Sequence, residues 1–374
     1  HRTGNCSIPP AMTRAKTPGR PGRRRALRGV ALTLLGAVLL GGAVHGLAWL
    51  WLTGVMTVAF SDWVTQQRAR GWEVDHDLPV RGGWPFAARL SVPDVHVAGW
   101  SPTLPQGFVW EAGRVDVTIA PPRIDQLAVT AEGPQRIVFG VLSIPYVASR
   151  LRVVLPFDRG PTARPAKLVV EGLRAETPDG LLTAGRVDAR MASGAADGEP
   201  TLGLRIEARE LGLPPLPQLA AFGRQVESAA LDAVLSGPPP PSLPMTPRER
   251  AEAWRAGGGT LDLQAATLRW GPLVGEMTMV LRLDAALQPV GNGRVVLERP
   301  GEVIASLAAA GAVDPRAAMT AQAVLGMVAR PPASGGAPRV DVPVAIADGV
   351  VSLARIPLLR LRPFTWPTEA PRLP

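Results

Sequence analysis

A long uncharged segment near the N-terminus constrains this chain more than any other feature. Residues 29–60 contain no Asp, Glu, Lys or Arg and are rich in Leu, Val, Ala and Gly. About 20 apolar residues are enough to cross the hydrocarbon core of a bilayer, so the segment predicts a transmembrane helix. Trp49 and Trp51 lie toward its end, where an aromatic belt is expected at the membrane surface.

A cleaved signal peptide is the alternative interpretation of this segment. The apolar region of a signal peptide runs for roughly 7–15 residues and ends in a site of small residues, and the segment here is about twice as long. It also ends in tryptophans rather than in small residues. We therefore expect an uncleaved anchor.

The basic residues beside the anchor predict its orientation. Residues 1–60 contain eight of the 40 Lys and Arg and none of the 31 Asp and Glu, so the rest of the chain is nearly neutral. Lys and Arg accumulate on the cytoplasmic side of a membrane. The N-terminus is therefore expected in the cytoplasm. In a bacterium the helix would then lie in the inner membrane and the bulk of the chain in the periplasm.

The same basic tail gives no sign of nucleic-acid binding. It lacks interleaved aromatic residues and directly precedes a membrane span, where Arg clusters bind anionic lipid headgroups. We expect the membrane as a partner, and no nucleic acid.

The pattern after the anchor predicts strands. Leu202–Arg209 alternates apolar and polar residues at a period of two, and residues 115–119, 277–283 and 340–346 do the same. Alternation with one polar face favours an antiparallel sheet. The expected fold class is mainly β (α+β), with an N-terminal transmembrane helix followed by a large antiparallel β-rich periplasmic domain with a few short helices. Gly291-Asn292-Gly293 predicts a tight hairpin turn.

Three short helices are expected among the strands. Residues 216–233 carry apolar side chains at helical spacing. Thr246-Pro247-Arg248-Glu249 is a capping box with proline at the first helical position, and it begins a helix through Trp254. Asp314-Pro315 precedes a third apolar stripe at residues 318–328.

A proline-rich stretch at residues 237–242 predicts a stiff linker between two lobes. The expected division is a basic cytoplasmic tail at 1–28, a transmembrane helix at 29–55, an interfacial helix at 56–72, a first β lobe at 73–212, a helical segment with the linker at 213–258, and a second β lobe at 259–374. The hexapeptide Ala112–Val117 recurs in similar form as Ala184–Ala189, which indicates either a repeated hairpin unit or chance.

Candidates for catalysis or metal binding are sparse. Cys6 is the single cysteine, so no disulfide forms within the chain. Asp75-His76-Asp77 would place its two Asp side chains on the face of a strand opposite to His76, which is poor geometry for shared metal ligation. His96 lies between two valines, and Lys167 is the one lysine after the anchor. Without hydrolase, zincin or P-loop motifs, we expect no catalytic residue, no metal, no cofactor and no enzyme.

A set of short motifs nevertheless recurs in an order that is typical of one family. The motifs are Gly71-Trp72-Glu73-Val74, Gly83-Trp84-Pro85-Phe86 with Arg89-Leu90, Trp254-Arg255-Ala256-Gly257-Gly258, Leu268-Arg269-Trp270-Gly271-Pro272-Leu273, Leu283–Gly291, Ala308–Gly311, and Val342-Pro343 with Asp348-Gly349. On these, residues 28–366 resemble the uncharacterised family of membrane-anchored bacterial proteins known as domain of unknown function 2125. Trp84 departs from the pattern, since a glycine usually stands before the Pro-Phe pair.

This resemblance implies a membrane-anchored topology and a fold, but it implies no mechanism, because the family has no established activity. The later motifs are also similar, more distantly, to envelope proteins of the AsmA type, which are implicated in lipid movement. Two functions stay open: a lipid-handling protein with an apolar trough, in which phospholipid is the partner, and a scaffold that binds another envelope protein. The trough itself has an alternative, a closed sandwich whose two lobes bury their apolar faces against each other.

Overall fold

The computed structural model describes residues 22–101, 104–140, 142–158, 164–196, 199–238, 246–311, 316, 318–319, 322–323, 337–354 and 356–366. The chain forms two compact units, His1–Trp51 and Leu52–Pro374. Four helices and 17 strands fall within the described ranges.

The helices are α1 Gly22–Ala69, η1 Pro217–Phe222 (a 3-10 helix), α2 Pro247–Ala256 and α3 Pro300–Ala309. The strands are β1 Glu73–Asp75, β2 Val80–Gly82, β3 Ala88–Ser101, β4 Leu104–Ala120, β5 Arg123–Phe139, β6 Leu142–Val147, β7 Arg150–Pro156, β8 Ala166–Thr177, β9 Gly180–Ala196, β10 Glu199–Gly212, β11 Gln225–Ser236, β12 Thr260–Trp270, β13 Leu273–Leu283, β14 Pro289–Glu298, β15 Arg339–Ala347, β16 Val350–Leu353 and β17 Ile356–Arg360.

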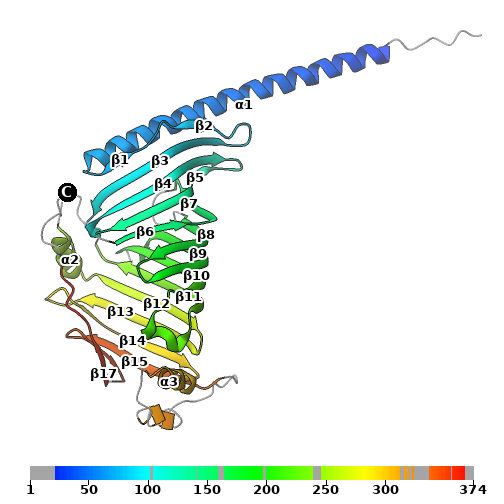
Figure 1. Ribbon diagram of the computed structural model, residues 1–374. Coiled ribbons are helices and arrows are strands. Elements are labelled where there is room, and N and C mark those ends of the chain that lie inside the picture. The colour runs from blue at the N-terminus through cyan, green and yellow to red at the C-terminus, as the bar shows by residue number, and fades with distance from the viewer. Residues whose placement is uncertain are drawn as a thin grey trace, which may run out of the picture. The chain divides into compact units, whose positions relative to one another are not determined.

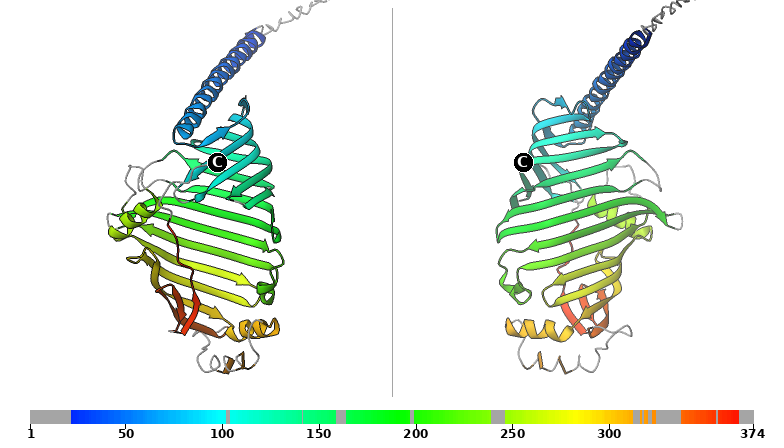
Figure 2. Two further views of the ribbon diagram at one scale, coloured as in Figure 1. Left: turned by 60° about the vertical axis from the view of Figure 1, so that its left-hand side comes forward. Right: turned by 90° about the vertical axis from the view of Figure 1, so that its right-hand side faces the viewer.

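All the strands join in a single 17-stranded sheet with antiparallel pairing, which confirms the predicted fold class. From β7 to β17 each strand pairs with the next one in the chain, so the sheet is a meander (Figure 1). Near its start, β1 and β2 both pair with β3, and β5 pairs with both β6 and β7. Figure 2 shows the successive strands crossing one curved sheet.

Helix α1 is the one helix, among the described residues, that is long and apolar enough to cross a membrane. It therefore fits the predicted N-terminal anchor. The helix continues without a break beyond residue 55 and covers most of residues 56–72, where an interfacial continuation of the helix was expected. In this last part Met56 and Val64 are buried, so residues 56–69 pack within the Leu52–Pro374 unit.

The sheet runs on through the stretch where two lobes were expected to separate. Strand β11 ends at Ser236 and pairs directly with β12, in which Thr260 is the partner of Ser236. Of the proline-rich linker predicted at 237–242, residues 239–242 lie outside the described ranges. The expected lobes at 73–212 and 259–374 thus share one sheet, and the segment at 213–258 supplies a strand of it.

One helix prediction is confirmed and one is wrong. Thr246 accepts a hydrogen bond from the Glu249 N–H and closes the predicted capping box at the start of α2. Residues 216–233, predicted as a helix, form η1 and most of β11 instead. Their Ala and Val residues suit either structure, and pairing with β10 and β12 on both sides decides for a strand.

The remaining local predictions have mixed outcomes. The third predicted helix, residues 314–328, lies largely outside the described residues, and α3 was not anticipated. The hairpin turn predicted at Gly291-Asn292-Gly293 is wrong, because these residues lie inside β14. The turn is at residues 284–288, where the Leu287 N–H donates to the Asp284 carbonyl.

A line of interrupted pairing crosses β3 to β11. Asp94, Gly172 and Glu210 have left-handed backbones (φ 45°, 60° and 55°), and the strand ladder skips a residue pair at each. The two copies of the repeated hexapeptide cross this line at Gly113 and at Gly185. In the first copy Arg114 forms ion pairs with Asp116 and with Glu132 of β5. In the second copy Arg186 forms the equivalent ion pairs with Asp188 and with Glu171 of β8. The two copies are therefore structurally equivalent over this segment.

Candidate functional site

The two faces of the sheet differ in chemistry from β3 to β15. Side chains alternate between the faces of a strand, so residues paired across successive strands form rows on one face. Two rows on one face run from β3 to β15. The first is Val92, Val115, Ala131, Leu151, Val170, Val187, Ala208, Ala229, Leu268, Gly275, Leu297 and Val340; the second is Leu90, Val117, Val129, Val153, Leu168, Ala189, Ile206, Leu231, Ala266, Met277, Val295 and Val342. Every member is apolar or glycine, and we call this side the apolar face.

The row between these two lies on the opposite side of the sheet, the charged face. Its members are Ser91, Asp116, Thr130, Arg152, Val169, Asp188, Glu207, Ala230, Thr267, Glu276, Val296 and Asp341. Ion pairs link neighbouring strands on this side, among them Arg186–Glu171 at 2.6 Å, Arg294–Asp341 at 3.0 Å and Arg205–Asp232. The Arg186 guanidinium lowers the pKa of the Asp188 carboxyl by hydrogen bonding. Asp116 is 4% exposed, whereas the other members of this row are half-buried or exposed, so most of the charged face is a solvated surface.

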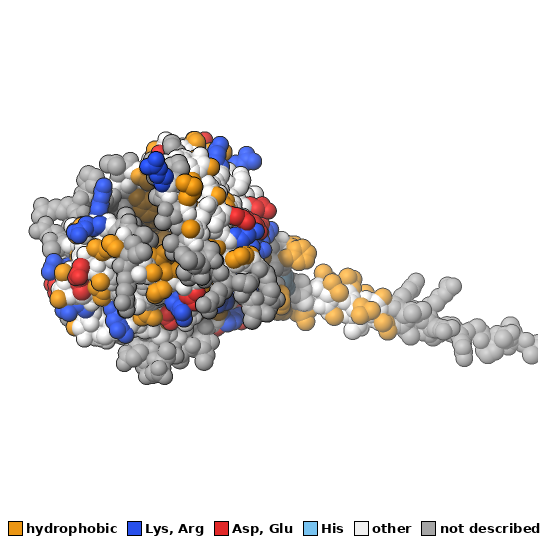
Figure 3. Space-filling model, turned by 90° about the horizontal axis from the view of Figure 1, so that it is seen from below, with side chains coloured by type: hydrophobic (Ala, Val, Ile, Leu, Met, Phe, Trp, Pro, Cys, Tyr) orange, Lys and Arg blue, Asp and Glu red, His pale blue; other side chains and the backbone are white. Residues whose placement is uncertain are grey.

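The apolar face is only partly covered by the rest of the protein. Of the 24 residues in its two rows, Leu90, Val92, Val115, Ala131, Val170 and Val340 are buried and the other 18 are half-buried. Next to these rows, Met191, Leu202 and Leu235 are 49%, 38% and 39% exposed, and Leu202 is the cross-strand partner of Leu235. Exposure of this extent does not fit the closed sandwich, in which such side chains would be sealed from water. Hydrophobic side chains gather in and around a hollow of the unit in Figure 3.

Over strands β11–β14, connecting segments cover the apolar face at both ends of the strands. At one end, η1 packs through Phe222 on Trp270, with ring centroids 5.2 Å apart, and α3 contacts both η1 and β13. At the other end lie α2 and the C-terminal segment Leu361–Trp366, which we call the C-terminal strap. The strap begins where the Leu361 N–H donates to the Gly349 carbonyl at 2.7 Å, and Trp366 lies near the turn between β13 and β14.

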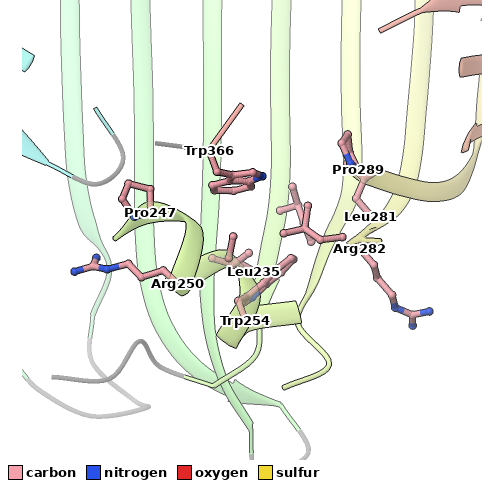
Figure 4. A pocket seen from close by; sticks show the side chains of 11 residues that line it. Leu235, Pro247, Arg250, Trp254, Leu281, Arg282, Pro289 and Trp366 are labelled. Atoms are coloured by element: carbon pink, nitrogen blue, oxygen red, sulfur yellow. The ribbon is translucent and has the colours of Figure 1, made fainter. Parts of the chain in front are cut away.

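An apolar pocket of about 350 Å³ lies between α2, the strap and the sheet. Its lining residues are Leu235, Pro247, Arg250, Ala251, Trp254, Leu261, Leu281, Arg282, Leu283, Pro289 and Trp366. Figure 4 shows Trp366 on one side of the pocket and Trp254 on the other, with the guanidinium groups of Arg250 and Arg282 extending outward. The Arg250 Nε atom is buried and has no hydrogen-bond partner in the described part of the chain. A pocket of this size and lining suits an alkyl chain.

Three of the family-motif tryptophans have structural roles at strand ends. Trp72 follows Gly71 (φ 84°) at the end of α1, and its ring lies against Gly99, where a Cβ would collide with it. The Trp254 Nε1–H donates to the Ser236 carbonyl at 3.0 Å, and the Trp270 Nε1–H donates to the Gly223 carbonyl at 2.9 Å.

The Trp270-Gly271-Pro272-Leu273 motif forms the turn between β12 and β13. Gly271 has a φ of 52°, and a Cβ on it would lie 2.6 Å from the Phe222 carbonyl oxygen. Leu273 begins β13 opposite Trp270. The end of η1 therefore lies too close to Gly271 for any residue with a Cβ atom to fit there.

The Gly83-Trp84-Pro85-Phe86 motif forms a turn between β2 and β3. Gly83 has a φ of 90°, and its carbonyl accepts hydrogen bonds from the N–H groups of Phe86 and Ala87. The Trp84–Pro85 peptide bond is cis. Trp84 and Phe86 are 58% and 83% exposed, so this turn presents two aromatic side chains on the surface.

The ionisable candidates from the sequence make separate side-chain contacts, although Asp75, which precedes His76, is the cross-strand partner of His96. The His76 ring lies against the Phe60 ring at 5.0 Å, whereas His96 lies 3.5 Å from Glu111 on the charged side. Lys167 is exposed on β8. No group of three His, Cys, Asp or Glu side chains with metal-binding geometry occurs among the residues that the structure describes.

The strap and the turn that holds it were not identified from the sequence. Leu287, in that turn, is 1% exposed and has a φ of 59°, and its carbonyl accepts a 2.9 Å hydrogen bond from the Trp366 indole. The signals present were the Leu283–Gly291 motif and Trp366 itself. They lie far apart in the chain, so their contact could not be deduced.

Comparison with known proteins identifies the family. A family model described as "Uncharacterized protein conserved in bacteria (DUF2125)" matches residues 49–362. Comparisons with curated proteins and with solved structures found no match. The more distant similarity to AsmA-type proteins is not supported by these comparisons. Because the match covers most of the chain, from the middle of α1 through the whole described sheet, the chain belongs to the bacterial family DUF2125.

Proposed function

We propose that this protein is a non-enzymatic lipid-handling protein of the bacterial envelope. Helix α1 anchors it in the inner membrane, the basic N-terminus is cytoplasmic, and the Leu52–Pro374 unit lies in the periplasm. The apolar face holds lipid acyl chains. The orientation rests on the excess of Lys and Arg before the apolar helix.

The observation that carries this proposal is the unbroken apolar character of the two rows across β3–β15. An antiparallel sheet commonly has one solvated polar face and one apolar face that is packed against another part of the protein or a ligand. Apolar surface left in water costs about 25 cal/mol per Å², and large uncovered patches in soluble domains mark binding surfaces. Rows that are half-buried over so many strands therefore favour an apolar ligand that extends along the sheet, as acyl chains do.

The absence of enzymatic activity is part of the same proposal. His76 and His96 lie on paired segments, since Asp75 is the cross-strand partner of His96. Their side chains make separate contacts, His76 with Phe60 and His96 with Glu111. Neither histidine nor Lys167 is among the residues that line the apolar pocket. A pocket whose walls are leucine, proline, alanine and tryptophan, with two arginines, offers no acid–base pair for catalysis. Binding without chemistry fits these groups best.

A second candidate is a scaffold that binds another envelope protein. The exposed Trp84 and Phe86 in the turn between β2 and β3 favour it, because aromatic residues dominate the binding energy of protein interfaces. In that case the apolar face would hold a segment of the partner rather than lipid.

Photo-crosslinking in living cells tests the proposal. A photoreactive amino acid at Leu202 or at Leu235, both on the apolar face, is expected to give phospholipid adducts. Val280 is the matched control, since it is 42% exposed but lies on the charged face. Discrete protein adducts from Leu202 and Leu235 would favour the scaffold. Equal lipid labelling from Val280, or none from either leucine, would refute lipid handling. Met279 and Val344, at 4% and 6% exposure, are too buried to serve as probes.

A further inference from the structure

The C-terminal strap is held in place by a few side-chain contacts rather than by a strand ladder. The Gln288 side chain binds the strap backbone twice: its Nε2–H donates to the Phe364 carbonyl at 3.0 Å, and its Oε1 accepts from the Phe364 N–H at 2.7 Å. Trp366 adds its hydrogen bond to the Leu287 carbonyl. Residues 361–366 form no helix or strand.

The strap contributes a wall to the apolar pocket. Trp366 lines it opposite Leu235, Leu261 and Leu281, which belong to one cross-strand row on the apolar face. Leu202 on β10 continues this row outside the pocket. The pocket is therefore continuous with the exposed part of the apolar face, and Trp366 occupies space beside the path that an alkyl chain would follow.

The position of Phe364 shows that the strap is not buried in a core. Its ring is 55% exposed and meets the Trp366 ring edge-on at 4.7 Å. A segment fixed by few hydrogen bonds and little buried area opens at low free-energy cost compared with the strands beneath it. The strands beneath it, in contrast, are held by a ladder between β13 and β14 in which no residue of the strap takes part.

We propose that the pocket under α2 takes the end of a lipid acyl chain and that the C-terminal strap is its lid, held closed by Gln288. This inference rests on the proposed function, since it needs acyl chains on the apolar face. Opening the strap withdraws Trp366 and widens the passage between the pocket and the exposed part of the face at Leu202. Closing the strap limits how far the acyl chain extends toward the turn between β13 and β14.

The test compares lipid adducts at two positions in the full-length, membrane-inserted protein. One photoreactive amino acid replaces Leu281 inside the pocket, and another replaces Leu202 outside it. Gln288→Ala removes both hydrogen bonds to Phe364 and leaves the pocket lining unchanged. Truncation after Leu361 removes the strap with its two aromatic rings. Gln264→Ala, at an exposed glutamine of β12, is the matched control.

Phospholipid adducts from Leu281 are expected to rise about three- to tenfold in Gln288→Ala and in the truncated protein, the effect of losing one or two neutral hydrogen bonds. Adducts from Leu202 should stay constant, and Gln264→Ala should match the parent protein at both positions. Unchanged or reduced labelling at Leu281 in both strap variants, with labelling at Leu202 retained, would overturn the lid and leave lipid handling intact. Loss of labelling at both positions in the parent protein would instead refute the proposed function.

Discussion

The indole ring of Trp254 lies against the Cα atom of Gly259, so close that a Cβ on Gly259 would collide with the ring. The same ring limits Gly237, where a Cβ would lie 2.9 Å from Trp254 Nε1. Trp254 thus joins the end of α2 to the two strand ends, of β11 and β12, between which the helix is inserted. This contact explains the Trp-x-x-Gly-Gly-Gly spacing of the sequence.

Gly259→Ala is therefore expected to destabilise the protein by about 1–3 kcal/mol, the usual cost of overpacking. Thermal unfolding of the full-length protein in detergent measures this. Gly301→Ala is the control, because a Cβ on Gly301 in α3 meets nothing within 4 Å; alanine there should be neutral or slightly stabilising. Equal unfolding temperatures for both variants would contradict the packing role of Gly259.

The strands could be predicted because apolar and polar residues alternate along them in the sequence. Leu202–Arg209 places its apolar residues on one face and its charged residues on the other, and β10 has this arrangement. The hairpin prediction at Gly291-Asn292-Gly293 failed for a physical reason that the sequence does not show. A Cβ on either glycine would collide with a carbonyl oxygen of β13, so these glycines permit close backbone approach within the sheet rather than a turn.

The candidate site was harder to predict from the sequence than the strands were. An apolar face was anticipated, but its continuity depends on the register of many strand pairs. The shift of alternation at Asp94, Gly172 and Glu210 depends on backbone conformations that residue type alone does not dictate for Asp or Glu. The pocket depends on Trp366 reaching Leu287, a contact between segments 79 residues apart.

A pH-dependent ion pair is expected at Asp158. Hydrogen bonds from Arg164 lower the pKa of this carboxyl from 3.8 to about 2. Because the pKa is depressed in the folded state, the contact is intact above pH 4 and is lost as the pH falls toward 2. A carboxyl NMR titration of the Asp158 signal measures the pKa directly. Arg164→Ala should return it close to 3.8, and a pKa that stays near 2 in this variant would show that Arg164 is not the cause.

The histidines and the lysine are expected to be dispensable. Replacing His76, His96 and Lys167 together by Gln should leave phospholipid adducts from Leu202 unchanged, because none of the three lies on the apolar face rows. The measurement is the crosslinking yield at equal protein level in the membrane. A loss of adducts from a folded, membrane-inserted triple variant would point to a site built on these residues.

The membrane topology is open to a direct test. A reporter enzyme that is active only in the periplasm, fused after Pro374, should be active, and the fusion should stay in the membrane fraction after an alkaline wash. Replacing Arg23, Arg24, Arg25 and Arg28 by Glu should reduce reporter activity, because in the proposed topology these residues supply the positive charge that keeps the N-terminus in the cytoplasm. Release of a shortened soluble protein would show that the apolar segment is a cleaved signal sequence.

The last prediction concerns a polar side chain on the apolar face, where we propose that acyl chains bind. Ile206 is half-buried in the middle of the apolar rows, between Ala189 and Leu231, whereas Val169 is half-buried on the charged face between Arg152 and Asp188. Ile206→Asn puts an amide into the apolar face, where it finds no partner and raises the cost of desolvation for a passing alkyl chain. Phospholipid bound per mole of purified protein, measured as organic phosphate, should fall several-fold in Ile206→Asn and remain unchanged in Val169→Asn. Both variants remove a half-buried apolar side chain of similar size, so the comparison separates lipid binding from a general loss of stability. An equal fall in both variants would show that bound lipid reports on stability alone, and no fall in Ile206→Asn would place the lipid elsewhere on the protein.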